Sequence, residues 1–438
     1  MEDPHMQTEQ SPDQIPLLDQ DQIHEEEEKD VSLDQTLQRL ENFLCFFGFR
    51  QSSFLSFLLS WTAFFLVGVA VPVAIFELCY CSDCEKYEIR KVEMGILASQ
   101  ACLAAISLLC VSHNLRKHGL RKFLFVDRYH GHMLRFRQEY IKKINGFFCL
   151  LVLWMLPCFL LKTSREIIRL IYVHHESWWQ SIAILVALVV SWTYLTIISL
   201  SASFLFNLVC NIQVIHFDDY GKLLERSSDV SIFIEEHIRL RHHLSKISHR
   251  FRIYLLLELL IVSISQFLTL FQTTGYRGII TFINGGDFAV SSVVQVVEII
   301  LCLYAAAKIS RRAQSIAAVA SRWHALVTSI SPDASHLRVS SSAGNLEAAY
   351  PVGSLSIGYS ESDLESLDYV AMPTNTHLAS YMSSYHKRQA FVMYLLSNLS
   401  GFTIFGWTVD RGMINTIFFL EFSLVLFVLG KTIVFTSK

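Results

Sequence analysis

The sequence predicts an all-α integral membrane protein with seven transmembrane helices, a cytosolic N-terminus and a C-terminus on the opposite side. Hydrophobic residues make up 52% of the 438 residues and charged residues only 17%, against about 25% charged residues in soluble domains. The apolar residues gather in seven runs, each close to the roughly 20 residues that span a bilayer. In hydrocarbon only a helix pairs all of its own backbone groups, so each run is predicted to be helical.

The chain begins with a segment predicted to be a mostly disordered, acidic cytosolic tail over 1–53, because charge is high and aromatic residues are few there. The tail contains a short pattern that resembles an acidic dileucine sorting signal, formed by Asp13, Leu17 and Leu18. An ordinary polar tail explains the same residues. The predicted spans then follow over 54–76, 94–112, 145–161, 181–208, 252–274, 288–307 and 413–435.

Basic residues in the loops predict the orientation, because cytosolic loops carry an excess of Lys and Arg. The loops after the second, fourth and sixth spans carry 24 of them, and the loops after the first, third and fifth spans carry 7. This inverted topology argues against a G-protein-coupled receptor, although Asp127, Arg128 and Tyr129 mimic that family's signature tripeptide. No G protein is therefore expected as a partner.

The cytosolic segments are predicted to be partly helical. Apolar residues recur at helical spacing over 231–250, directly before the fifth span, and the sixth span continues through 311–328. Residues 54–328 thus form one unit of six spans with cytosolic extensions. A Ser-rich stretch over 329–375 is predicted to be a disordered insertion, and 376–438 to hold a cytosolic helix, a Gly-rich break and the seventh span.

Three carboxyl groups fall inside predicted spans, where an ionised group is costly: Glu258, Glu298 and Glu421. They serve either as hydrogen-bonded packing residues or as part of an ion path. Ser199, Ser203, Asn207 and Asn211 recur every four residues on one face of the fourth span, a pattern that favours interhelical packing.

Cysteine usage predicts one local feature. Three cysteines follow the first span on the predicted outer side, Cys79, Cys81 and Cys84. Two of them can form a disulfide in an oxidising compartment, whereas three thiols without a fourth ligand make a poor zinc site.

The sequence holds no catalytic signature, such as a phosphate-binding loop, a nucleophile elbow or a zinc-protease motif. We therefore expect no enzyme activity, no cofactor and no metal, with a membrane enzyme as the least favoured function. A net charge of −3 argues against nucleic acid as a partner.

Three segments carry a resemblance. The segment 401–412, with Gly401, Asp410 and Arg411, resembles the stretch that joins the two halves of the last helix in insect gustatory receptors. The stretches 135–140 and 305–324 resemble more closely a plant family of multi-pass proteins of unknown function, considered a distant relative of the insect odorant and gustatory receptors. Of the insect receptors' C-terminal signature, only Ser423 is similar.

The resemblance implies a homotetrameric, ligand-gated ion channel whose last helix lines the pore. The implied pore-lining residues are Ser423, Phe427, Gly430 and Lys431. The implied partners are the lipid bilayer, further copies of the chain and an unknown small-molecule ligand, in the plasma membrane or the vacuolar membrane. The alternative is a non-conducting membrane scaffold or transporter of the same fold.

Overall fold

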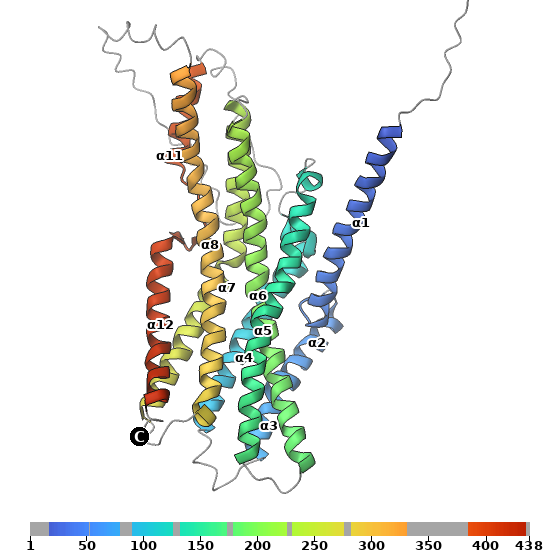
Figure 1. Cartoon of the computed structure of the whole chain (residues 1–438), viewed down its shortest axis with the longest axis vertical. Coiled ribbons are helices and arrows are strands. Elements are labelled where there is room, and N and C mark those ends of the chain that lie inside the picture. Colours follow the sequence, from blue (N-terminus) through green and yellow to red (C-terminus); the bar gives the residue numbers. More distant parts are fainter. Residues whose placement is uncertain are drawn as a thin grey trace, which may run out of the picture.

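The structure, a computed structural model, describes residues 17–51, 53–78, 90–125, 132–172, 178–225, 230–275, 282–330 and 384–434. Long helices run side by side through this part of the chain, and the only strands within it form one short hairpin (Figure 1). Six helices are long and apolar enough to cross a membrane. The predicted all-α, multi-pass architecture is confirmed to that extent, whereas the seventh span and the orientation stay predictions.

The first of the six spans is a composite of α2 (Phe54–Ala63), the π-helix η1 (Phe64–Ala70) and α3 (Val71–Leu78). The Ser53 side chain caps α2 by accepting a hydrogen bond from the Ser56 backbone N–H at 3.2 Å. A close contact fixes η1, because a Cβ at Gly68 would lie 2.7 Å from Leu195 Cδ2. No pattern in the apolar run indicated this π-helical segment.

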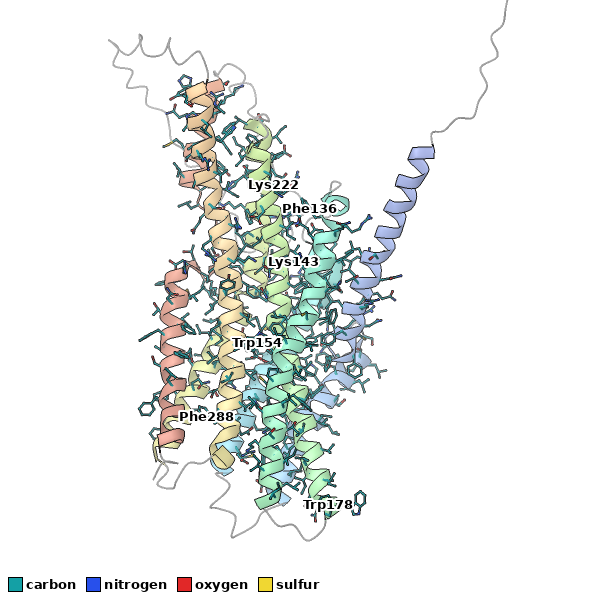
Figure 2. All side chains as sticks on the ribbon, viewed as in Figure 1. Phe136, Lys143, Trp154, Trp178, Lys222 and Phe288 are labelled. Atoms are coloured by element: carbon teal, nitrogen blue, oxygen red, sulfur yellow. The ribbon has the colours of Figure 1, made fainter. Side chains whose placement is uncertain are left out.

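Five longer helices supply the other spans: α4 (Arg90–Leu124), α5 (His132–Tyr172), α6 (Trp178–Glu225), α7 (Val230–Gly275) and α8 (Phe282–Ile330). α6 lies at the centre and packs on α4, α5 and α8. Figure 2 shows Trp178 at one end of the bundle and Lys222 towards the other. The exposed Trp178 and Trp179 suit a membrane interface.

α6, α7 and α8 extend well past the apolar runs, and α11 (Ser384–Ser397) packs beside α8 at the same end (Figure 1). The ring of Phe233 lies 5.6 Å from Trp323 and 5.8 Å from Phe391, so three helices share one small core there. Ile238 and Leu244 are buried within the single chain. Both side chains therefore stabilise the subunit itself.

Part of the segment predicted to be mostly disordered is helical, since residues Leu17–Phe46 form α1. Its second half carries a buried stripe formed by Leu33, Leu37, Leu40 and Leu44, and Phe43 packs edge-on against Phe147 and Phe148 of α5. The free energy gained by burying this apolar surface offsets the conformational entropy that the segment loses when it becomes ordered. Most of the predicted insertion 329–375 lies outside the described residues.

The Gly-rich break forms a hairpin of β1 (Thr403–Ile404) and β2 (Trp407–Thr408) before α12 (Arg411–Val434). Phe402 at its base is fully buried and donates its backbone N–H to Ser310 Oγ at 2.9 Å. The Thr403 N–H bonds to Ser248 Oγ at 3.2 Å. The hairpin is thus docked on α7 and α8, and it places α12 alongside both helices (Figure 1).

Candidate functional site

The polar face of α6 meets two of the intramembrane carboxyl groups. Ser199 Oγ donates to Glu298 Oε2 of α8 at 2.7 Å, and Ser203 Oγ donates to Glu258 Oε1 of α7 at 3.2 Å. Both carboxyl groups are almost fully buried. The Ser pattern and the carboxyl groups were separate features of the sequence, and the structure brings them together at the centre of the bundle.

Two more groups complete this polar core. The Tyr254 hydroxyl lies 2.9 Å from Ser203 Oγ, and Cys302 Sγ lies 3.9 Å from Glu258 Oε1. Ser203 Oγ also approaches the Ser199 carbonyl at 3.4 Å, so hydroxyl groups connect the surroundings of the two carboxyl groups. We use the name polar core for Ser199, Ser203, Tyr254, Glu258, Glu298 and Cys302.

The polar face of α6 continues towards the extensions. Asn211 Nδ2 donates to Asn207 Oδ1 at 2.8 Å, and Lys308 Nζ of α8 donates to Asn211 Oδ1 at 2.7 Å. These contacts agree with the packing role that the four-residue spacing favours. They also extend the row of polar side chains on α6 from the polar core to the cationic side chain of Lys308.

A dense ionic cluster lies nearer the other end of the bundle. Arg165 of α5 bonds to Glu93 of α4 and, at 2.5 Å, to Glu166. Lys162 lies 3.0 Å from Glu166 and pairs with Asp287 of α8, and Arg169 Nη1 reaches Glu93 at 3.3 Å. We call these six residues, three cations and three anions, the outer charge cluster. Its charges balance, and its exposure is low throughout.

Sequence reasoning missed this cluster. Lys162, Arg165 and Arg169 fall just after the third apolar run and were counted as loop residues, although α5 continues through them to Tyr172. Their spacing of three and four residues, together with Glu166, puts all four on one helix face, which is the signal that was available. Nothing local indicated Glu93 or Asp287, which are 72 and 125 residues away from their partners in sequence.

The third carboxyl group lies on α12. Glu421 is buried and accepts a hydrogen bond from Ser263 Oγ of α7 at 2.6 Å. Ser423 and Phe427 are exposed, on a different side of α12 from Glu421, and the Ser423 hydroxyl bonds to the Phe419 carbonyl at 2.6 Å. Gly430 and Lys431 also belong to α12, but the surroundings of these two residues are not described.

Two other predicted sites also lie outside the described part of the chain. Cys79, Cys81 and Cys84 are among the residues that the structure does not describe, as is Asp13 of the sorting-signal pattern. Leu17 and Leu18 begin α1, but their side chains are not described. The disulfide and the sorting signal therefore stay predictions.

Within the described ranges, no group of three or more His, Cys, Asp or Glu side chains is placed so that it could hold a metal ion. The candidate site consists instead of buried carboxyl groups that accept hydrogen bonds from hydroxyl groups. Such groups bind a proton or a small cation, or hold helices together.

Comparison with known proteins gives one match. A family described as "Protein of unknown function (DUF3537)" matches residues 35–420. No curated protein and no solved structure matches the chain. The resemblance to a family of unknown function is supported by this match, whereas the likeness to insect gustatory receptors gains no support from it.

Proposed function

Since this chain belongs to the DUF3537 family of proteins of unknown function, and since it holds six helices that suit a membrane, we propose that it is one subunit of a homotetrameric, ligand-gated ion channel. In this proposal α12 is the seventh span and surrounds the central axis. The channel would resemble those of insect gustatory and odorant receptors.

The position and faces of α12 are the observation that carries the proposal. One stripe of the helix, formed by Ile414, Ile417 and Glu421, packs towards α7 and α8. The face that holds Ser423 and Phe427 is open, and the Phe427 side chain is 53% exposed. Four copies around an axis would place a ring of Phe427 at a constriction, and apolar constrictions gate by dewetting.

The cytosolic end supports assembly. α11 buries Phe391 and Leu395 within the subunit and leaves Met393 and Leu396 exposed, at 58% and 49%, and Leu399, which follows the helix, is 60% exposed. These residues lie beyond the apolar runs, in the layer of the helix extensions (Figure 1). Burial of this stripe against another copy would be driven by the hydrophobic effect, which is weak between helices in lipid.

The test is current recording from the purified protein in a planar bilayer. We expect Phe427→Ser to raise the open probability, because a polar ring wets the constriction. Phe422→Ser is the matched control: Phe422 is an equally large, exposed side chain of α12, about 140° away around the helix at 3.6 residues per turn. Lys431→Glu should shift the reversal potential in a salt gradient if that side chain faces the pore.

Assembly is tested on the same sample. Wild type should have the mass of four chains, and the pair Met393→Asp with Leu396→Asp should lower it while the subunit stays folded, because both side chains are exposed within it. Equal currents in the Phe427 and Phe422 variants, together with an unchanged mass, would contradict the proposal.

A non-conducting transporter or scaffold of the same fold is the second candidate. The polar core favours it, because carboxyl groups buried at the centre of one subunit suit a substrate or ion site that works without a shared pore. Uptake of an ion or solute by sealed vesicles that show no single-channel current would favour a transporter, and an absence of both would favour a scaffold.

A further inference from the structure

A small cavity lies beside the polar core. It has a volume of about 10 Å³, close to the least space that one water molecule needs. Its polar lining consists of Gln100 from α4, Thr196 and Ser199 from α6, and Gln295 and Glu298 from α8. Leu103, Leu195 and Val294 close the rest of the wall. Three helices thus contribute oxygen-bearing side chains to one small cavity.

Hydrogen bonds outside the cavity orient the two amide groups that line it. Gln100 Nε2 donates to Ser291 Oγ at 2.6 Å, and Gln295 Nε2 donates to Ser99 Oγ at 3.2 Å. Each amide nitrogen donates one of its two hydrogens to a neighbouring hydroxyl, and neither amide oxygen accepts a hydrogen bond within the described chain, so both oxygens are available to a ligand. An amide oxygen accepts hydrogen bonds and binds cations.

Glu298 brings the negative charge. Its Oε2 accepts the hydrogen bond from Ser199, while its Oε1 is buried and has no partner within the described chain. None of the cations there forms an ion pair with it. The carboxylates of the outer charge cluster, in contrast, are each matched by Lys or Arg. A buried carboxylate without a counter-charge is costly, so this one is suited to a cationic ligand.

We propose that this cavity binds one monovalent cation, Na⁺ in preference to K⁺, with Glu298 Oε1 as the charged ligand. The oxygens of Gln100, Thr196, Ser199 and Gln295 supply the neutral part of the coordination shell. A single carboxylate balances one positive charge, whereas Ca²⁺ sites use several carboxylates and 6–8 oxygens. The small volume favours Na⁺, because Na⁺ is clearly smaller than a water molecule, whereas K⁺ is about as large as one.

A second cavity lies beside the first one. It has a volume of about 30 Å³ and is lined by Glu93, Lys162, Glu166 and Asp287 of the outer charge cluster, and Gln100 lines both cavities. Gln100 is thus the residue that the proposed site shares with the cavity at the outer charge cluster. The proposed site lies inside one subunit and needs neither α12 nor a tetramer, so it stands independently of the channel proposal.

The test is the thermal unfolding of the full chain in detergent, followed by Trp fluorescence, with NaCl, KCl and choline chloride exchanged at constant ionic strength and pH. A ligand that binds only the folded state raises the midpoint as its concentration rises. We expect the midpoint to rise by about 2 °C or more in about 150 mM Na⁺, less in K⁺ and not at all in choline.

Glu298→Gln should abolish the Na⁺ effect while it keeps the hydrogen bond from Ser199. Glu421→Gln is the matched control, because Glu421 is also buried with one unpartnered oxygen but does not line the cavity; it should keep the effect. Thr196→Val provides a milder variant if Glu298→Gln fails to fold, and it should raise the half-saturating Na⁺ concentration by about three- to tenfold.

Three outcomes would overturn the inference. The first is an equal unfolding midpoint in Na⁺ and choline, which would indicate a buried water. The second is an undiminished Na⁺ effect in both Glu298→Gln and Thr196→Val. The third is a midpoint that depends on pH but not on the cation present, which would assign a proton to Glu298.

Discussion

Arg165 is the most enclosed cation of the outer charge cluster, with 1% of its surface exposed. It contacts both Glu93 and Glu166, so its removal leaves two buried carboxylates short of positive charge. We expect Arg165→Met to lower the free energy of unfolding by about 3–5 kcal/mol, the range for breaking a buried ion pair by loss of one partner. Thermal unfolding in detergent measures this.

Arg121 provides the control for that variant. Its ion pair with Asp34 has a length of 2.9 Å, but both side chains are largely exposed. Arg121→Met should therefore change stability by less than about 1 kcal/mol. Equal losses in the two variants would mean that the outer charge cluster does not hold α4, α5 and α8 together.

His237 lies in the part of α7 that extends past its apolar run, about 22 Å before that run begins at residue 252, at 1.5 Å per residue. Burial and the charge of Arg241 lower its pKa to about 4. Its ring nitrogen lies 3.4 Å from the Tyr394 hydroxyl of α11, and Tyr220 of α6 packs against the ring. The neutral imidazole is thus part of the contact between three helices.

The sign of the pH effect follows from the two pKa values. An unfolded His binds its proton below about pH 6.5, whereas the folded one stays neutral down to about pH 4. The extension is therefore fully stabilised above pH 6.5 and loses about 2 kcal/mol at pH 5 through this residue. Hydrogen exchange of α7 and α11 measures the loss, which His237→Gln should reduce. Exchange that is independent of pH after correction for the intrinsic rate would contradict this.

At the scale of the element, the end of α1 depends on one glycine. Gly48 has a φ of +79°, and the Phe49 N–H bonds back to the Leu44 carbonyl at 2.9 Å, which closes the last turn. A Cβ at Gly48 would lie 2.3 Å from Ser60 Oγ of α2. We expect Gly48→Ala to cost about 2–4 kcal/mol, from the left-handed backbone and the overlap together.

Gly221 is the matched control within α6. A Cβ there meets nothing within 4 Å, and the position is an ordinary helical one. Gly221→Ala should stabilise the chain by about 0.5–1 kcal/mol, because it reduces the freedom of the unfolded state. A Gly48→Ala variant as stable as Gly221→Ala would show that the turn between α1 and α2 is not fixed by this contact.

The spans were predictable because each is a long apolar run, and the same rule failed where a signal was short or mixed. The buried stripe of α1 stands in the sequence at Leu33, Leu37, Leu40 and Leu44, but the neighbouring Glu residues favoured disorder. The hairpin at 403–408 depends on contacts with Ser248 and Ser310, which no local pattern reveals.

The same limit applies to the candidate site. Glu258, Glu298 and Glu421 were found because an ionisable residue in an apolar run is conspicuous. Their partners on other helices were not predictable, since a single sequence carries no record of which helices adjoin. Gln100 and Gln295 were missed because placing a neutral amide in a membrane span costs less free energy than placing a charge there, so an amide is a weaker signal of a functional site.

For the whole molecule, the buried cluster sharpens the charge asymmetry on which the orientation rests. Lys162, Arg165 and Arg169 lie in α5 and are paired with carboxylates, so they are not loop charges. Three of the seven basic residues counted on the predicted outer side are therefore neutralised by carboxylates within the bundle. The predicted orientation thus depends less on the outer loops than the sequence alone indicated.

Whether α12 crosses the membrane decides between six spans and seven. Its 24 residues extend about 36 Å at 1.5 Å per residue, more than the roughly 30 Å of hydrocarbon, and it lies beside α7 and α8 with an apolar exposed surface.

We expect epitope tags at Gln7 and Ser342 to be protected in intact cells or sealed organelles, and a tag at Lys438 to be accessible from the other side. Ser342 serves as the internal control, because the segment between α8 and α11 must share the side of the N-terminus if six spans precede it. A Lys438 tag on the same side as Gln7 would mean that α12 does not cross, and the pore assigned to Ser423 and Phe427 would be wrong with it.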